Sequence, residues 1–316
     1  MKKLRVVFAV MFALMSAFGL AQAAEEQLIL ATGGTAGTYY PFGGSMAKIW
    51  NTKIPGMNVT AQSTGASGEN VRLVNKKEAE LALVQSDTLD FAFNGKESFK
   101  EPLTAMKAIA VLYPEIIQVV VRADGPAKTF ADLKGMKVGV GAPGSGTEAN
   151  FRQLMDVYGL PKDAVSAQYL SFSESGEQFK DKHIDAFLVT AGIPNAAIMD
   201  ISSQHDVRIL NISEDMIKKL TEKYPFLSPA KIPANTYKGQ SEDVSTVAVN
   251  AVLIVNADIK DDVVYNLTKA LFDNQAELAA AHAKGKELNL ANAVKGVSIP
   301  FHPGAVKYYK EKGLMK

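Results

Sequence analysis

The chain of 316 residues is 47% hydrophobic and carries 34 basic and 33 acidic residues, for a formal net charge of +1 at pH 7. Beyond its first residues it has no Lys- and Arg-rich block, so it lacks the clustered positive charge that nucleic acids and anionic membrane surfaces attract. It contains no cysteine, which excludes disulfides, thiol nucleophiles and cysteine-ligated metals. Its length exceeds that of one typical domain, so we expect two.

Residues 1–23 have the pattern of a secretory signal peptide. Three basic residues within the first five positions precede an apolar run over 6–20, and Ala21-Gln22-Ala23 fits the small-x-small cleavage rule. The run is too short to span a membrane comfortably, and no second apolar segment follows. Removing this segment would change the net charge from +1 to −2. We therefore expect export to the periplasm as a soluble protein.

The next part of the chain alternates short apolar runs with helical patterns. Strands are expected at 28–31, 58–61, 81–84, 108–112 and 116–121, with helices around 45–51, where Trp50 faces the core, and 69–75. This alternation is typical of a largely parallel, doubly wound sheet. Binding loops of such sheets lie at the carboxyl ends of the strands, and polar groups follow the first three strands there.

A second alternating series begins after Arg122, with strands expected at 137–141, 168–171, 186–190 and 207–211. The apolar run 244–256 is too long for a surface linker and predicts a strand that crosses back, with 119–122 beside it as the other half of a hinge. The fold class is therefore α/β with two lobes, each a doubly wound and mostly parallel sheet, joined by two hinge strands. We place the first lobe at 24–122 and 250–316, and the second at 123–249.

The C-terminal part is expected to be helical. Apolar residues follow helical spacing from Asp261 to His282, and Tyr308 to Lys312 should form a short polar helix that ends the chain. Between them, the prolines of the segment 300–305 predict a loop.

Two glycine-rich loops each follow an apolar run and precede a helical pattern. They cover 33–44 and 139–147. Glycines leave backbone N–H groups uncovered, and the first turn of a helix has orphan donors at the positive end of the helix dipole. Such a loop can hold an anion or a carboxylate. Either loop alone would indicate a tight turn, but the pair, with hydroxyls at matching places, predicts two lobes that face one cleft.

The residues do not form a catalytic motif. Gly141 to Gly146 has the outline of a phosphate-binding loop, but Thr147 stands where the phosphate-binding lysine should be. There is no G-x-G-x-x-G after the first strand and no G-x-S-x-G, and the four histidines lack metal-ligand spacing. We therefore predict no catalytic residue, no metal site and no cofactor. The hydroxyls, amides and bare backbone that remain are suited to binding a small polar ligand without reacting with it.

Several motifs together resemble one family. They are Thr32-Gly33-Gly34-Thr35-Ala36-Gly37-Thr38-Tyr39-Tyr40-Pro41 and the segments 63–70, 82–87, 141–147, 185–187 with 191–194, and 302–305. In combination they resemble the TAXI solute receptors of TRAP transporters, over essentially the whole chain after residue 23. The resemblance implies a periplasmic, two-lobed, type II binding protein that closes on its ligand and delivers it to a membrane permease driven by a sodium gradient.

The resemblance also implies a ligand and its contacts. The ligand would be L-glutamate, 2-oxoglutarate or a related small amino acid or dicarboxylate. The contacts would fall on Gly34, Thr35, Tyr39, Ser67, Asn70, Gln85, Ser145, Gly146, Thr147 and Gly192. We expect backbone N–H groups and hydroxyls to hold the carboxylate, with Arg152 as a helper.

Several alternatives stay open on the sequence alone. A ligand ammonium could pair with Glu69, Asp87 or Glu148, although each of these equally fits a role in helix capping. The same fold could serve an ATP-driven importer or a signalling partner, or it could carry an enzyme. Nothing demands more than a monomer.

Overall fold

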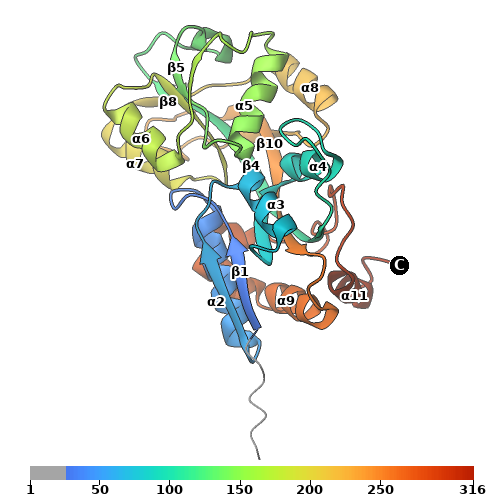
Figure 1. Ribbon diagram of the computed structural model, residues 1–316. Coiled ribbons are helices and arrows are strands. Elements are labelled where there is room, and N and C mark those ends of the chain that lie inside the picture. Colours follow the sequence, from blue (N-terminus) through green and yellow to red (C-terminus); the bar gives the residue numbers. More distant parts are fainter. Residues whose placement is uncertain (1–25) are drawn as a thin grey trace, which may run out of the picture.

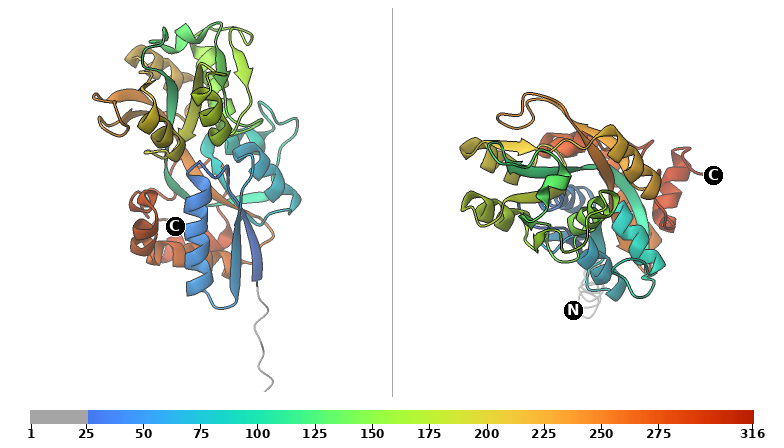
Figure 2. Two further views of the ribbon diagram at one scale, coloured as in Figure 1. Left: turned by 90° about the vertical axis from the view of Figure 1, so that its left-hand side faces the viewer. Right: turned by 90° about the horizontal axis from the view of Figure 1, so that it is seen from above.

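The computed structural model describes residues 26–316 as two lobes joined by two long strands (Figure 1). The expected signal peptide, residues 1–23, lies outside the described residues. Within the range described, no helix is both long enough and apolar enough to cross a membrane. The left view of Figure 2 separates the lobes along the vertical, with helix α2 (Tyr39–Lys53), in blue, in the lower one.

The first lobe combines the two ends of the described chain. Its strands β1, β2 and β3 run parallel in the order β2-β1-β3, and helices cover both faces. One apolar core includes Trp50, whose Nε1 donates to the Leu267 carbonyl, and a second core lies under α3 and α4. The elements are β1 (Glu26–Ala31), α2 (Tyr39–Lys53), β2 (Met57–Gln62), α3 (Ser67–Lys76), β3 (Leu81–Gln85), α4 (Ser86–Asn94), α9 (Asp261–Asp273), α10 (Gln275–Ala281), the 3-10 helix η2 (Ala283–Lys286) and α11 (Pro303–Glu311).

The second lobe repeats this plan. Strands β6, β5 and β7 run parallel in that order, and one apolar core lies on each face of the sheet. The elements are the 3-10 helix η1 (Phe130–Leu133), β5 (Lys137–Gly139), α5 (Gly146–Val157), β6 (Ser166–Gln168), α6 (Phe172–Lys180), β7 (Ala186–Ala191), α7 (Ala196–Gln204), β8 (Val207–Ile209), α8 (Glu214–Lys223) and β9 (Ser228–Ile232).

Strands β4 (Met106–Arg122) and β10 (Val244–Asn256) connect the lobes. They pair antiparallel from Asn256↔Met106 to Ala248↔Ile116. In the first lobe β10 also pairs with β3, and in the second β4 pairs with β7, both antiparallel. The predicted α/β fold of two lobes with two connecting strands is confirmed, but the sheet is mixed, because the parallel triplet of each lobe adjoins antiparallel hinge strands.

The outgoing hinge strand differs from the prediction. The segments 108–112 and 116–121, expected as two strands, are parts of β4, since Pro114 and Glu115 continue the ladder with β10. Residues 119–122 lie beside β7 and β8, not beside β10, because β4 leaves β10 after Ile116. The side chains of Ile117 and Val119 pack in a core of the second lobe. The chain therefore crosses between the lobes near Pro114, before the expected position at residue 122.

The C-terminal part also differs. The segment expected as one helix over 261–282 is two helices that meet at Asn274. Helix α11 begins at Pro303, inside the segment expected as a loop, and His302 caps it by accepting from the Gly304 N–H. Proline is favourable at the first helical position, where its missing N–H would have had no partner. Tyr308 and Tyr309 are buried, so this helix packs on the first lobe and is not a polar surface helix.

Candidate ligand-binding site

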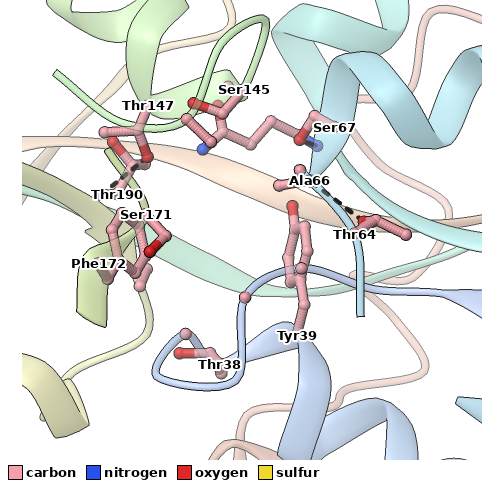
Figure 3. A pocket seen from close by; sticks show the side chains of 18 of the residues that line it. Thr38, Tyr39, Thr64, Ala66, Ser67, Ser145, Thr147, Ser171, Phe172 and Thr190 are labelled. Carbon is pink, nitrogen blue, oxygen red and sulfur yellow. Dashed lines mark hydrogen bonds between the residues drawn. The ribbon is translucent and has the colours of Figure 1, made fainter. Parts of the chain in front are cut away.

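A cavity lies between the two lobes (Figure 3). Its empty volume is about 570 Å³, which includes the space that opens to solvent. The lining residues are Gly33, Gly34, Gly37, Thr38, Tyr39, Thr64, Gly65, Ala66, Ser67, Gln85 and Glu115 from the first lobe and its hinge strand, and Ala142, Ser145, Gly146, Thr147, Ser171, Phe172, Thr190 and Ala191 from the second lobe.

The N-termini of five helices converge on this cavity. Residues at or next to the first turns of α2, α3 and α4 from the first lobe, and of α5 and α6 from the second, line it. A helix N-terminus presents unsatisfied N–H donors and carries a partial positive charge. No lysine or arginine is among the described residues that line the cavity. The site therefore offers an anion backbone donors and helix dipoles in place of a cationic side chain.

Hydroxyl groups from both lobes surround the same space. Figure 3 shows Ser67 and Tyr39 of the first lobe and Ser145 and Thr147 of the second around it. Ser145 is also the N-cap of α5 and accepts from the Glu148 N–H. These side chains could orient a polar ligand by hydrogen bonds.

Two buried polar atoms on lining residues lack a partner. Within residues 26–316, Gln85 Oε1 accepts no hydrogen bond, and Thr190 Oγ1 neither accepts nor donates one. Buried polar groups are nearly always paired in folded proteins, so an unpaired group needs an explanation. Their position at the cavity is consistent with hydrogen bonds to a ligand.

The lobes are closed over the cavity. The Gly192 N–H of the second lobe donates to Thr38 Oγ1 of the first at 3.1 Å, and Asn195 Nδ2 donates to the Ala36 carbonyl at 3.2 Å. A methyl group on Gly68 of α3 would clash with the carbonyl oxygen of Gly144 in the second lobe. Glycine at position 68 therefore permits a close approach of the two backbones.

One acidic side chain reaches the cavity, that of Glu115 in β4. Its Oε2 accepts a hydrogen bond of 2.6 Å from the Tyr39 hydroxyl, and both residues are buried. Burial raises the pKa of Glu115 to about 8; the Tyr39 hydrogen bond and Lys284 oppose this rise and Asp87 adds to it. Burial also raises the pKa of Tyr39 well above its usual value, so Tyr39 keeps its proton and donates it.

A family model described as the NMT1-like family matches residues 30–313. The chain belongs to the NMT1-like family.

Solved structures share the fold of this NMT1-like protein. A protein from Bordetella bronchiseptica RB50 has a TM-score of 0.56 at 18% identity, with 93% of this chain and 91% of that chain covered. A putative L-cystine ABC transporter from Listeria monocytogenes has a TM-score of 0.53 at 12% identity, with 84% and 98% covered. The alkanesulfonate-binding protein SsuA from Xanthomonas axonopodis pv. citri, bound to MOPS, has a TM-score of 0.51 at 14% identity, with 93% and 96% covered. These likenesses show a type II binding-protein fold, but they do not confirm the TAXI assignment.

Seven of the ten predicted contact residues of this NMT1-like protein line the cavity: Gly34, Tyr39, Ser67, Gln85, Ser145, Gly146 and Thr147. The other three do not. Thr35 is exposed on its loop. Asn70 is fully buried and donates to the carbonyls of Thr32 and Leu83, so it fixes neighbouring strand ends. Gly192 packs against the Lys284 side chain.

The acidic residues proposed as ammonium partners do not line the cavity either. Glu69 accepts from the Gly65 N–H, and Glu148 accepts from the Gly144 N–H and pairs with Arg152. These contacts fix the loops that precede α3 and α5, so both residues act in helix capping, as one of the two interpretations expected. Asp87 accepts from two amides of α5. Arg152 is engaged by Glu148 and lies outside the lining.

Sequence reasoning missed Glu115, Ser171, Phe172 and Thr190. Ser171 was expected to end a strand over 168–171, but it is the N-cap of α6, which begins at Phe172. Thr190 is in β7, a strand that the sequence predicted without selecting Thr190 for binding. One feature of the sequence could have identified Glu115: it is the sole acidic residue in the apolar run 106–122. A charged residue inside a buried strand is costly and therefore a candidate for function. Among the described residues, no group of three or more His, Asp or Glu side chains could hold a metal ion.

Proposed function

We propose that this protein is a solute-binding protein that captures a small organic acid between its lobes and presents it to a membrane importer. The observation that carries the proposal is the convergence of five helix N-termini on one cavity between two lobes. A carboxylate at this point would accept hydrogen bonds from uncovered N–H groups and gain from the helix dipoles. The hydroxyls of Ser67, Ser145 and Thr147 would orient the rest of the ligand.

Closure of the lobes would couple binding to transport. Because both lobes contribute to the lining, a ligand makes more contacts in the closed state and shifts the population toward it. The hinge strands β4 and β10 connect the lobes and can bend as the lobes separate. The closed shape is then the signal by which a membrane partner distinguishes loaded from empty receptors.

The lining supports binding and not turnover. Its serine and threonine hydroxyls have no histidine or lysine beside them in the set of lining residues. A hydroxyl nucleophile needs such a base for activation. Glu115, the acidic group present, already accepts from Tyr39.

For the partner, the structural neighbours favour the alternative of an ATP-driven importer over a TRAP permease. One neighbour is described as a putative L-cystine ABC transporter, and another, from Staphylococcus aureus, as the ligand-binding component of an ABC-type import system with a TM-score of 0.52 at 10% identity. The signal-like pattern of residues 1–23 supports a periplasmic location. Ligand uptake by spheroplasts that express the protein would separate the two partners: vanadate should block ATP-driven uptake, and collapse of the sodium gradient should block a TRAP permease.

A thermal-shift screen tests the binding function. The chain, refolded from denaturant to remove any carried ligand, would be heated with amino acids, mono- and dicarboxylates and 2-oxo acids. A ligand that binds the folded state, at about 100 times its Kd, should raise the Tm by at least about 5 °C. No shift with any small organic acid, from a sample shown to be folded, would overturn the proposal.

A further inference from the structure

The side chain of Glu115 occupies an unusual position in the cavity. It lies where β4 crosses between the lobes, is 2% exposed, and is the charged residue in the cavity lining. Tyr39 donates to its Oε2. No group within residues 26–316 donates a hydrogen bond to its other oxygen, Oε1. The lining therefore presents one carboxylate oxygen with acceptor capacity to spare.

Within residues 26–316, no basic side chain forms a salt bridge with this carboxylate. The charge of Lys284 lowers the Glu115 pKa, but Lys284 Nζ pairs with Glu287 at 2.6 Å and the Lys284 stem packs on Gly192. Asp87, the other charged group that acts on it, is acidic and opposes ionisation. The neighbouring hydroxyls of Tyr39 and Tyr113 stay neutral, because burial raises the pKa of both well above the usual value. A buried carboxylate without a cation is unfavourable unless a partner arrives.

We propose that Glu115 binds the ammonium group of the ligand, so that this receptor selects zwitterionic amino acids. The ligand carboxylate would lie at the helix N-termini and its ammonium at Glu115 Oε1. This inference rests on the proposed function and names its substrate class. The cavity is complementary to such a ligand because five positive helix ends and one acidic side chain line the same space.

Protonation follows from this arrangement. In the closed form without ligand, burial raises the Glu115 pKa to about 8, so the carboxyl is mostly neutral at pH 7. Pairing with an ammonium requires the ionised form. Binding at pH 7 therefore transfers one proton from the Glu115 carboxyl to the buffer, and affinity rises with pH toward 8. A ligand without an ammonium would favour the neutral carboxyl and release no proton.

The experiment is calorimetric titration of the refolded, ligand-free protein. The probes are matched pairs that differ at the ammonium: L-glutamate and 2-oxoglutarate, L-alanine and pyruvate, and L-leucine and 4-methyl-2-oxopentanoate. The variant is Glu115→Gln, which keeps the shape and the acceptor for Tyr39. The matched control is Glu80→Gln, because Glu80 accepts from the Ile29 N–H at 2.7 Å and lies outside the cavity lining.

We expect Glu115→Gln to weaken the amino acid about 10- to 100-fold, the usual cost of a lost hydrogen bond to a charged group. Affinity for the oxo acid should change by less than about threefold, and Glu80→Gln should change neither. Titration of the unmodified protein in two buffers of different ionisation enthalpy should show nearly one proton released per amino acid at pH 7. This second readout needs no variant to fold.

Other outcomes overturn the inference. They are preference for the oxo member of each pair, equal loss of both members in Glu115→Gln, and binding of an amino acid without proton release. If the protein binds only acids that lack an ammonium, including dicarboxylates, the inference fails and the proposed receptor function stands. If it binds no small organic acid at all, the proposed function fails with it.

Discussion

Asp87 on α4 accepts a hydrogen bond of 2.9 Å from Asn150 on α5 and thereby joins the two lobes. Gln153, one turn further along α5, donates to the same Oδ2 at 3.0 Å. All three residues are buried, and none lines the cavity. Burial raises the Asp87 pKa while these hydrogen bonds oppose the rise. The closed state is therefore held partly by protein contacts that a ligand does not touch.

Weakening this contact should shift the equilibrium toward the open state. Asp87→Asn keeps one acceptor oxygen but turns the other position into a donor that faces the amides of Asn150 and Gln153. We expect a larger radius of gyration for the ligand-free variant in small-angle X-ray scattering, and about 3- to 10-fold weaker binding, since the closed state must be repopulated. The control is Asp90→Asn, because within residues 26–316 the Asp90 side chain bonds only Asn94 of its own helix. Unchanged scattering and affinity for Asp87→Asn would contradict a role of the Asp87 contacts in holding the closed state.

Gly68 offers a way to separate closure from stability. Alanine at this position of α3 should favour the helix by about 0.5–1 kcal/mol, yet its methyl group would clash with the Gly144 carbonyl across the cleft. We expect Gly68→Ala to leave the Tm equal or higher while ligand affinity falls at least about 10-fold. Gly44→Ala is the matched control, because a methyl group on Gly44, in α2, has open space around it. Gly44→Ala should raise the Tm and leave ligand affinity unchanged. A Gly68→Ala protein that binds ligand normally would show that binding does not need the close approach of the two lobes at Gly68.

The hydroxyls of α5 test the position of the ligand carboxylate. Ser145→Ala with Thr147→Ala should weaken binding about 10-fold or more, because both side chains line the cavity. Loss of the Ser145 cap should also cost about 1 kcal/mol of stability. Thr221→Ala on α8 serves as the control, since among the described residues the Thr221 hydroxyl bonds only carbonyls of its own helix. Unchanged affinity of the double variant in calorimetry would move the binding site elsewhere.

The sequence was informative where function depends on local chain geometry. Ser145, Gly146 and Thr147 were found because a glycine loop between a strand and a helix has a short-range signature, and the fold brings such loops to one cleft. Asn70 has the same local signature, but its amide bonds two carbonyls of the first lobe. Only the packing of strand ends around it decides between these roles, and that packing is a tertiary property.

Glu115 and the interlobe contacts depend even more on tertiary structure. Glu115 lies in an apolar strand, far in sequence from either glycine loop, and reaches the cavity because β4 crosses between the lobes at that point. Likewise, Asp87 and Asn150 are 63 positions apart, and their contact exists only when the lobes close. Periodicity and motif spacing carry no information about such pairs. The position of the hinge crossing near Pro114 was missed for the same reason.

The stability of the empty protein should depend on pH through Glu115. Its pKa is raised from 4.5 to about 8 in the folded chain. Between these values the folded state keeps a proton that the unfolded state has lost, so the free energy of unfolding falls as pH rises and levels off above pH 8. The total loss is no more than about 5 kcal/mol at 1.36 kcal/mol per pKa unit.

Glu115→Gln removes this titration, so its Tm should fall less from pH 5 to pH 8 and exceed that of the unmodified protein at pH 8. Parallel Tm curves for the two proteins would show that Glu115 does not bind its proton more tightly in the folded state, and the basis for proton release on ligand binding would be lost.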